Sequence, residues 1–250
     1  MVVDKEIIRL ASLRTGIGLK AVSKELAISG MLAHLWKIGG EGVTLKGGTA
    51  MNRIYTKKRF SEDIDIDASA ARARAVGKAL RRIEGFDADG PRRMGNVLRY
   101  DCRYTNDFGE TDKIRVEFNT ATAKYAEAPV KAMVDSFIIP GMPTEFMAYP
   151  LPELIAQKLD ALLSRQDGKD VFDLFYALDM DFSRSALHKA LEARDLGNVK
   201  ELKDRLIVRL EEMKERAQYV GNSTNHYIPV ALRPDWKGFM DTLVFKLRKI

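Results

Sequence analysis

Acids and isoleucines alternate between Asp63 and Asp67, and this is the segment of the chain whose residue types are best suited to chemistry. In a β-strand successive side chains point to opposite faces, so Asp63, Asp65 and Asp67 would share one face while the two isoleucines enter a core. Carboxylates held this close repel one another unless a cation lies between them. Mg²⁺ prefers oxygen ligands and is commonly bound by one or two carboxylates together with substrate phosphates. The spacing therefore predicts a metal–nucleotide site on a strand.

A glycine-rich turn, Lys46–Thr49, comes shortly before the acidic segment. Residues 49–56 are predicted to form a helix, and the first backbone N–H groups of a helix point toward bound phosphate. Glycines let a phosphate approach the backbone because they carry no side chain. The turn is not a P-loop, since no Gly-Lys-Ser/Thr follows. Lys46 either adds positive charge here or is simply exposed, and Ser61 either reaches a phosphate or metal-bound water or closes a turn.

A second alternating segment, residues 113–119, offers a further carboxylate. Its apolar side chains would face inward and leave Glu117 on the outer face. If this strand pairs with the acidic strand, the two lie within about 5 Å of each other. Two Mg²⁺ ions roughly 3.5–4 Å apart can stabilise the attacking and leaving oxygens of an in-line displacement, which calls for several carboxylates on stiff elements. Glu117 is either the third carboxylate or the cross-strand partner of a basic residue.

Two cations followed by two anions stand out in the second half of the chain. Lys158 and Arg165 share one face of a predicted helix, and Asp170 and Asp173 follow at helical spacing. On a generic helix such charges are solvated. Alternatively, salt bridges among them could order a lysine that binds a triphosphate.

The remaining patterns predict an α+β fold, with a domain boundary near residue 148. Residues 1–148 are expected to form a small mixed β-sheet flanked by helices, and residues 149–250 a helical C-terminal domain. Predicted helices lie at 4–38 (two helices broken near Gly16 and Gly18), 49–56, 68–83, 153–165, 170–178, 201–218 and in a C-terminal segment around Trp236; predicted strands lie at 43–45, 62–67, 97–104, 113–119 and 137–139, with a turn at 106–109.

Composition describes an ordinary globular protein, with 46% hydrophobic and 30% charged residues in 250. No apolar run approaches the roughly 18–20 residues that cross a bilayer, and the first residues lack the plan of a secretory signal. The single cysteine, Cys102, excludes an internal disulfide, and with three histidines it leaves no plausible zinc site. We therefore expect a cytoplasmic protein. The formal net charge of +6 permits a polyanionic partner without requiring one.

Three motifs, taken in order, resemble the AbiEii/AbiGii toxin family of nucleotidyltransferases, relatives of the polymerase-beta and minimal nucleotidyltransferase superfamily. They are Lys-Gly-Gly-Thr-Ala at 46–50, Arg-Phe-Ser-Glu-Asp-Ile-Asp at 59–65, and a helix at 153–165 followed by Lys-Asp-Val-Phe-Asp-Leu at 169–174. The resemblance implies a nucleotidyltransferase core and a helical C-terminal half that completes the active site. It also implies Mg²⁺-dependent transfer of a nucleotide from an NTP, RNA such as tRNA as acceptor, and a toxin with a cognate antitoxin.

The resemblance also assigns roles residue by residue. Ser61, Asp63 and Asp65 match the first acidic motif, and Lys158 matches the family's lysine, which would neutralise charge on the triphosphate. Asp170, with Asp173 after it, matches the later acid, which would orient that lysine or act as base. The predicted site is thus Asp63, Asp65, Lys158 and Asp170 as catalytic residues, Lys46, Gly47, Gly48, Thr49, Ser61 and Arg165 for the nucleotide, and Asp63, Asp65 and Glu117 for Mg²⁺; Asp67 is an extra acid, and Met51 stands where leucine is usual.

Two alternatives keep the same fold. The acceptor could be a protein, either this one or a partner. The chain could instead be a non-catalytic RNA- or partner-binding protein, although such a retired site should lose its acids first and every matched acid is present. Sequence-specific DNA binding is not expected. If the chain is the non-catalytic binding protein, six arginines could form its phosphate-binding face: Arg81, Arg82, Arg92, Arg93, Arg99 and Arg103.

Overall fold

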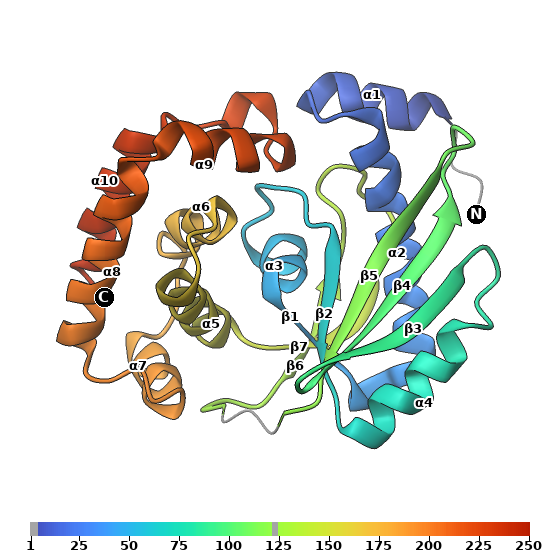
Figure 1. The fold of residues 1–250 in the computed structure, drawn as a ribbon, viewed down its shortest axis with the longest axis horizontal. Helices are drawn as coiled ribbons and strands as arrows, with labels where there is room; N and C mark the ends of the chain where they lie inside the picture. Colours follow the sequence, from blue (N-terminus) through green and yellow to red (C-terminus); the bar gives the residue numbers. More distant parts are fainter. Residues whose placement is uncertain (1–4, 122–124) are drawn as a thin grey trace. The chain divides into compact units, whose positions relative to one another are not determined.

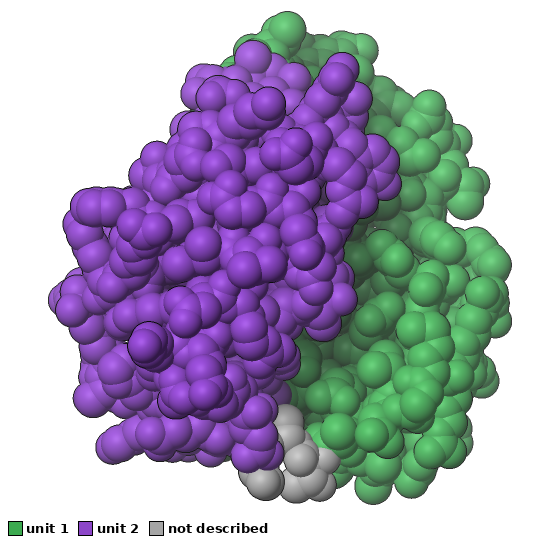
Figure 2. Space-filling view, turned by 60° about the vertical axis from the view of Figure 1, so that its left-hand side comes forward, with its two compact units in different colours: residues 1–123, 129–148 green, residues 124–128, 149–250 purple. Residues whose placement is uncertain are grey.

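The computed structural model describes residues 5–121 and 125–250. The chain divides into two compact units, coloured separately in Figure 2. Unit 1 comprises residues 1–123 and 129–148 and contains the β-sheet, whereas unit 2 comprises residues 124–128 and 149–250 and is helical in its described part. The predicted α+β class, with a sheet in the first part and helices in the second, is confirmed.

Strands of unit 1 form one mixed sheet in the order β3-β4-β5-β2-β1-β7-β6 (Figure 1). The acidic strand β2 lies inside it, antiparallel to β1 and parallel to β5. The strands of the described chain are β1 (Thr44–Lys46), β2 (Asp63–Asp67), β3 (Asp87–Met94), β4 (Val97–Thr105), β5 (Thr111–Asn119), β6 (Val130–Val134) and β7 (Thr144–Ala148).

Alternation decides which face of the sheet is buried. Ile64 and Ile66 of β2 are completely buried, as are the inward-facing apolar residues of β5. The helices α2 (Leu19–Gly39) and α4 (Ala70–Leu80) pack against this apolar face. Gly77 lets α4 approach closely, because a Cβ there would lie 2.1 Å from the ring of Tyr100 in β4. The acidic side chains of β2 therefore point to the opposite face, as predicted.

Two further helical segments flank the sheet of unit 1. Helix α1 (Lys5–Thr15) precedes α2, and the break between them falls at the predicted glycines, Gly16 and Gly18. A four-residue helix, α3 (Gly47–Ala50), continues as a π-helical turn over Met51–Tyr55. The glycines of the turn are thus the first residues of this helix, although the sequence placed its start at Thr49. A 3₁₀ turn over Gly40–Gly42 leads from α2 into β1.

Helices make up the described part of unit 2. Their side-chain caps are typical: Asp167, Ser183, Asn198 and Asp235 each accept a hydrogen bond from the backbone N–H two or three residues later. Pro152 lies in the first turn of α5, as predicted. The helices are α5 (Leu151–Ser164), α6 (Gly168–Ala177), α7 (Arg184–Ala193), α8 (Val199–Lys214), α9 (Ala217–Thr224) and α10 (Trp236–Leu247), with 3₁₀ turns at Asn225–Tyr227 and Val230–Leu232. None of the described helices is both long enough and apolar enough to cross a membrane.

The structure corrects several predicted elements. Residues 137–139 are not a strand, because the Ser136 hydroxyl accepts the backbone N–H groups of Ile138 and Ile139 and closes a turn. The strands of this region are β6 and β7, on either side of that turn. Strand β3, helix α7 and the division of 201–218 into α8 and α9 were also missed. Strand β3 is mostly exposed and contains Gly90-Pro91, so it lacks the apolar alternation that identifies a strand.

Candidate functional site

Strand pairing brings the predicted acids onto one surface of unit 1. In the parallel pair β2–β5, Asp65 is the register partner of Glu117, Asp63 of Arg115, and Asp67 of Asn119. Residues that are partners in adjacent strands point to the same face, so Asp65 and Glu117 are side by side. Residues 113–119 therefore do pair with the acidic strand, which was the condition for Glu117 to lie beside the acids of β2. Two carboxylates on neighbouring, hydrogen-bonded strands make a stiff oxygen-rich surface.

Asp63 is held by a basic residue that was not among the predicted site residues. Arg115 donates from Nε to Oδ1 at 2.6 Å and from Nη2 to Oδ2 at 2.7 Å, so both carboxylate oxygens are engaged. Burial lowers the pKa of Arg115, but the neighbouring Asp63, Glu117 and Glu62 carboxylates outweigh this and raise it. Sequence alternation already places Arg115 on the outer face with Glu117. The strand register, which decides its partner, is a non-local property.

Asp67, the extra acid, also has partners. Lys46 Nζ lies 2.8 Å from its Oδ1, and the amide of Asn119 donates to the same oxygen at 3.0 Å. Lys46 is therefore only partly exposed, and it is tied to the end of the acidic strand. This contact joins the entrance of the glycine turn on β1 to β2.

The two glycines of the turn pack directly on the acids. Gly47 has a φ of +65°, and a Cβ there would lie 2.2 Å from Oδ2 of Asp65. A Cβ on Gly48 would lie 2.8 Å from a guanidinium nitrogen of Arg59 and 3.0 Å from the Ser61 hydroxyl. Only glycine satisfies both the left-handed backbone and the close approach at position 47. The turn is thus shaped around the carboxylate of Asp65.

Thr49 and Ser61 bind each other beneath the turn. The completely buried Thr49 hydroxyl donates to the backbone carbonyl of Asp63 and lies 3.0 Å from Ser61 Oγ. Ser61 is itself almost fully buried. Both hydroxyls therefore fix the glycine turn against the start of β2.

A buried ion pair, which the sequence analysis did not predict, anchors the π-helical turn Met51–Tyr55 that continues α3. Arg53 lies 2.8 Å from a carboxylate oxygen of Glu25 in α2, and it donates to Ser29 Oγ at 2.9 Å. Asn52 adds a second tie, donating to the Gly48 carbonyl and accepting from the backbone of Arg59. The only sequence signal was a pair of polar residues inside an otherwise apolar helical segment.

Unit 2 contains the other predicted residues in one charged cluster. Lys158 Nζ lies 2.8 Å from Asp170 and 2.7 Å from Asp173, and Arg165 binds Asp170 at 2.8 Å. The side chain of Lys158 is only 7% exposed, whereas that of Arg165 is 58% exposed. The charges are thus not simply solvated, and salt bridges order the lysine as the second reading predicted. Burial would raise the pKa of Asp170, but Lys158 and Arg165 together hold it well below its usual range.

The carboxylates of the acidic surface suit a hard cation that keeps part of its water shell. Within the described residues, no three histidine, cysteine, aspartate or glutamate side chains converge as a protein cage requires. Magnesium, however, usually keeps several waters and takes only one or two carboxylates, with phosphates completing its shell. Asp65 and Glu117, which are register partners, fit that requirement, and Asp63 lies two residues from Asp65 on the same face of β2. Cys102 does not, because it is buried and its pKa is raised to about 12 by burial and nearby acids.

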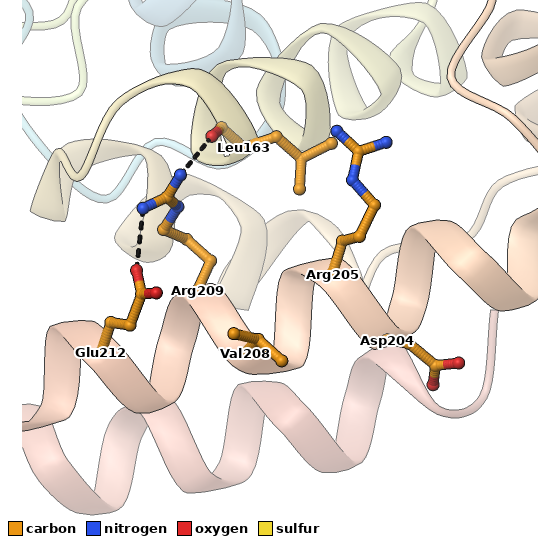
Figure 3. A pocket seen from close by; sticks show the side chains of 6 residues that line it. All are labelled: Leu163, Asp204, Arg205, Val208, Arg209 and Glu212. Atoms are coloured by element: carbon orange, nitrogen blue, oxygen red, sulfur yellow. Dashed lines mark hydrogen bonds and ion pairs between the residues drawn. The ribbon is translucent and has the colours of Figure 1, made fainter.

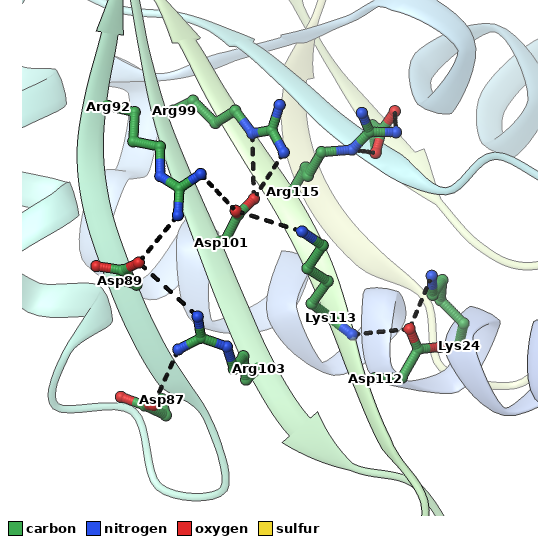
Figure 4. Close-up of polar contacts among 11 residues, drawn as sticks. Lys24, Asp87, Asp89, Arg92, Arg99, Asp101, Arg103, Asp112, Lys113 and Arg115 are labelled. Atoms are coloured by element: carbon green, nitrogen blue, oxygen red, sulfur yellow. Dashed lines mark hydrogen bonds and ion pairs between the residues drawn. The ribbon is translucent and has the colours of Figure 1, made fainter.

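Three of the six predicted arginines, Arg92, Arg99 and Arg103, are ion-paired on the sheet surface (Figure 4). The buried Asp101 forms ion pairs with three basic side chains: Arg99 at 3.1 Å, Lys113 at 3.4 Å and Arg92 at 4.0 Å. Arg103 pairs with two aspartates of β3. The surface is therefore a mixed array of charges rather than a uniformly basic face.

A separate open pocket of about 370 Å³ lies in unit 2, between Leu163 and the α8 helix (Figure 3). Among its lining residues, Arg209 donates to Glu212 at 2.8 Å and to the Leu163 carbonyl at 2.9 Å (Figure 3). None of the predicted site residues lines this pocket.

Comparison with known proteins places this geometry in context. Residues 32–249 match a family described as "Nucleotidyl transferase AbiEii toxin, Type IV TA system", which confirms the resemblance seen in the motifs. No curated protein matches the chain significantly. The fold is similar to MenT4, a nucleotidyltransferase toxin from Mycobacterium tuberculosis, with a TM-score of 0.67 and 15% identity over 100% of this chain and 91% of that one. It is also similar to JHP933 from Helicobacter pylori, with a TM-score of 0.55 and 17% identity over 93% and 95% of the two chains.

The first prediction concerns Gly47. Replacing it with alanine should lower the free energy of unfolding by about 1–2 kcal/mol for the left-handed backbone and by a further 1–3 kcal/mol, roughly, for the clash with Asp65. Gly95→Ala is the matched control, because Gly95 has a similar φ of +58° and nothing within 4 Å of a new Cβ. Urea unfolding followed by circular dichroism measures both variants. Equal losses would contradict the packing of the turn on Asp65.

The second prediction concerns Asp170 and pH. Because its pKa is lower in the folded than in the unfolded protein, it stabilises the fold above the unfolded value near 3.8, and this is lost as the pH falls through the folded pKa. Acidification from about pH 5 to about pH 2 should therefore reduce the free energy of unfolding, and less steeply in Asp170→Asn. The exposed Glu215→Gln is the control and should leave the slope unchanged. An unaltered slope in Asp170→Asn would show that Lys158 and Arg165 do not hold this carboxyl ionised.

Proposed function

The chain belongs to the AbiEii family of nucleotidyltransferase toxins of type IV toxin–antitoxin systems, and we propose that it transfers a nucleotide from an NTP to RNA in a Mg²⁺-dependent reaction. We expect tRNA in the cytoplasm as the acceptor. Membership of the family implies a cognate antitoxin. The proposal concerns the metal, the acceptor and the residues that serve them.

One observation carries the proposal: Asp65 and Glu117 are register partners, with Asp63 on the same face and Gly47 packed against Asp65. Nucleotidyl transfer asks a protein mainly for positioning and for neutralisation of charge. Carboxylates on hydrogen-bonded strands can hold a hard cation in a fixed place. A glycine turn beside them leaves room for the phosphates that the cation must also bind.

The residues of unit 1 would bind the metal, contact the triphosphate and support the glycine turn. Asp63, Asp65 and Glu117 would hold Mg²⁺, which supplies positive charge to the reacting phosphate when bound. The backbone at Gly47 and Gly48 would lie against the triphosphate. Thr49 and Ser61 would act by holding that turn on β2, since their hydroxyls are buried against each other.

Of the two cations in the charged cluster of unit 2, Arg165 is the more accessible. The charge of Lys158 is balanced by two buried carboxylates, whereas more than half of the Arg165 side chain is exposed. We therefore propose that Arg165 meets a phosphate and that Lys158 and Asp170 orient it. A carboxyl whose pKa is held low is a weak base, which favours the orienting role for Asp170 over the base. We also propose that residues 1–148 and 149–250 are the two domains.

An RNA acceptor is favoured over a protein acceptor by charge. The formal net charge of +6 attracts a polyanion and would not select a polypeptide. The mixed charges of the sheet surface give no separate support to a non-catalytic basic protein, because Arg92, Arg99 and Arg103 already have acidic partners.

The third prediction tests the transfer itself. Purified protein is incubated with Mg²⁺, each of the four α-³²P-labelled NTPs in turn, and total tRNA, and the products are resolved on denaturing RNA and protein gels. Label should appear on RNA. It should fall by about two to four orders of magnitude in Asp63→Ala, because several kcal/mol of charge stabilisation are lost.

Asp87→Asn is the matched control, an exposed acid of β3 on the same sheet. It should retain full transfer. Label on polypeptide would move the acceptor from RNA to protein. Undiminished transfer by folded Asp63→Ala would contradict the assignment of the acidic strand.

A further inference from the structure

Arg115 binds the carboxylate of Asp63, the first of the proposed metal ligands along the chain. Its two donors meet both oxygens of Asp63, at 2.6 Å and 2.7 Å, in the bidentate geometry that makes arginine–carboxylate pairs strong and specific. The two residues are also register partners on β5 and β2, so the backbone holds them side by side. This contact is part of the sheet, rather than a chance meeting of two long surface side chains.

The guanidinium relieves repulsion in a crowded group of acids. Asp63, Glu62 and Glu117 all act on Arg115, and like charges this close destabilise one another without a cation. The sequence predicted that a cation must lie among these carboxylates. In the structure the chain itself supplies one.

Two other basic side chains of the same surface, Arg99 and Lys113, bind a different acid. Arg99 donates from Nε and Nη2 to Asp101 at 3.1 Å, and Lys113 reaches the other oxygen of Asp101 at 3.4 Å. Arg99 lies across from Glu117 in the β4–β5 register. It is therefore close in the sheet to the proposed metal ligands but bound elsewhere.

The pair is accessible enough to exchange. The side chain of Arg115 is 36% exposed and that of Asp63 is 31% exposed. Because water and dissolved anions reach the pair, another anion can compete with Asp63 for the guanidinium. A phosphate is well suited, because its oxygens accept the same two-pronged contact as a carboxylate.

We propose that Arg115 is a resident counter-cation of Asp63 that competes with the divalent cation, and that the phosphates of an NTP free Asp63 by giving the guanidinium another partner. The proposal rests on the proposed function only in taking Asp63 as a metal ligand. Arg115 is then a positioning residue that acts through Asp63. Binding of metal and nucleotide is coupled, and the coupling is reciprocal: each strengthens the other by the same factor.

The test measures metal binding without turnover. Mn²⁺, which suits carboxylate ligands as Mg²⁺ does, is titrated into the protein, and free Mn²⁺ is followed by electron paramagnetic resonance. Each titration is done with and without an α,β-methylene NTP, which cannot transfer its nucleotide, and the Mn²⁺ bound by the nucleotide alone is measured without protein and subtracted. The variants are Arg115→Gln, Arg115→Lys, Arg99→Gln and Asp63→Asn, each checked for folding by circular dichroism.

In wild-type protein, the nucleotide should lower the Kd for Mn²⁺ by about tenfold, a usual size for coupling between sites. In Arg115→Gln, Mn²⁺ without nucleotide should bind about tenfold more tightly than in wild type, and the nucleotide should strengthen Mn²⁺ binding by a smaller factor than in wild type. Arg115→Lys should fall between the two, since a lysine makes one contact in place of the fork. Arg99→Gln removes the same charge from the same surface and should behave as wild type.

Three results would overturn the inference. If Arg115→Gln, or Arg115→Lys should the former not fold, binds Mn²⁺ and couples to nucleotide as wild type does, Arg115 does not compete for Asp63, and the proposed function stands. If Arg99→Gln strengthens Mn²⁺ binding as much as Arg115→Gln, the effect is one of net charge alone. Undiminished Mn²⁺ binding in Asp63→Asn would remove Asp63 from the metal site and overturn the proposed metal assignment as well.

Discussion

The parallel pairing of β2 with β5 is the constraint on which the rest of the proposed site depends. It buries the isoleucines of β2 against the helical side of the sheet, and the same register sets Asp65 beside Glu117 and Asp63 beside Arg115. A shift by one residue would turn every acid into the core and every isoleucine to water. The apolar core and the acidic surface are therefore fixed by one set of backbone hydrogen bonds.

The other contacts of unit 1 bring the glycine turn to that surface. Gly47 packs against Asp65, and the buried Arg53–Glu25 pair holds the π-helical turn Met51–Tyr55 against α2. A buried pair of this kind adds little net stability, but breaking it is costly because one charge is left unpaired. Such a contact favours one arrangement of the turn over others. In unit 2, Asp170 and Asp173 order Lys158 in the same way.

Much of this could be predicted from local sequence patterns. Alternation in β2 and β5, the Gly-Gly turn and the spacing of Lys158, Arg165, Asp170 and Asp173 all depend on residues close together in the chain. Partners far apart could not be read in this way. The contact of Arg115 with Asp63 needs the strand register, and that of Arg53 with Glu25 needs the packing of α2. Strand β3 was missed because Gly90-Pro91 and its exposed charges hide it, and β6 because an edge strand buries little.

The central claim is that the carboxylates joined by this strand pairing bind the catalytic metal. Its most direct test is a crystal structure of the protein with Mn²⁺ and an α,β-methylene NTP, with the metal located by its anomalous scattering. The account predicts Mn²⁺ in contact with carboxylate oxygens of Asp65 and Glu117, with Asp63 released from Arg115 to join them, and with phosphate oxygens of the nucleotide. Mn²⁺ bound to the nucleotide at other residues, with these two carboxylates left out of its ligands, would contradict it.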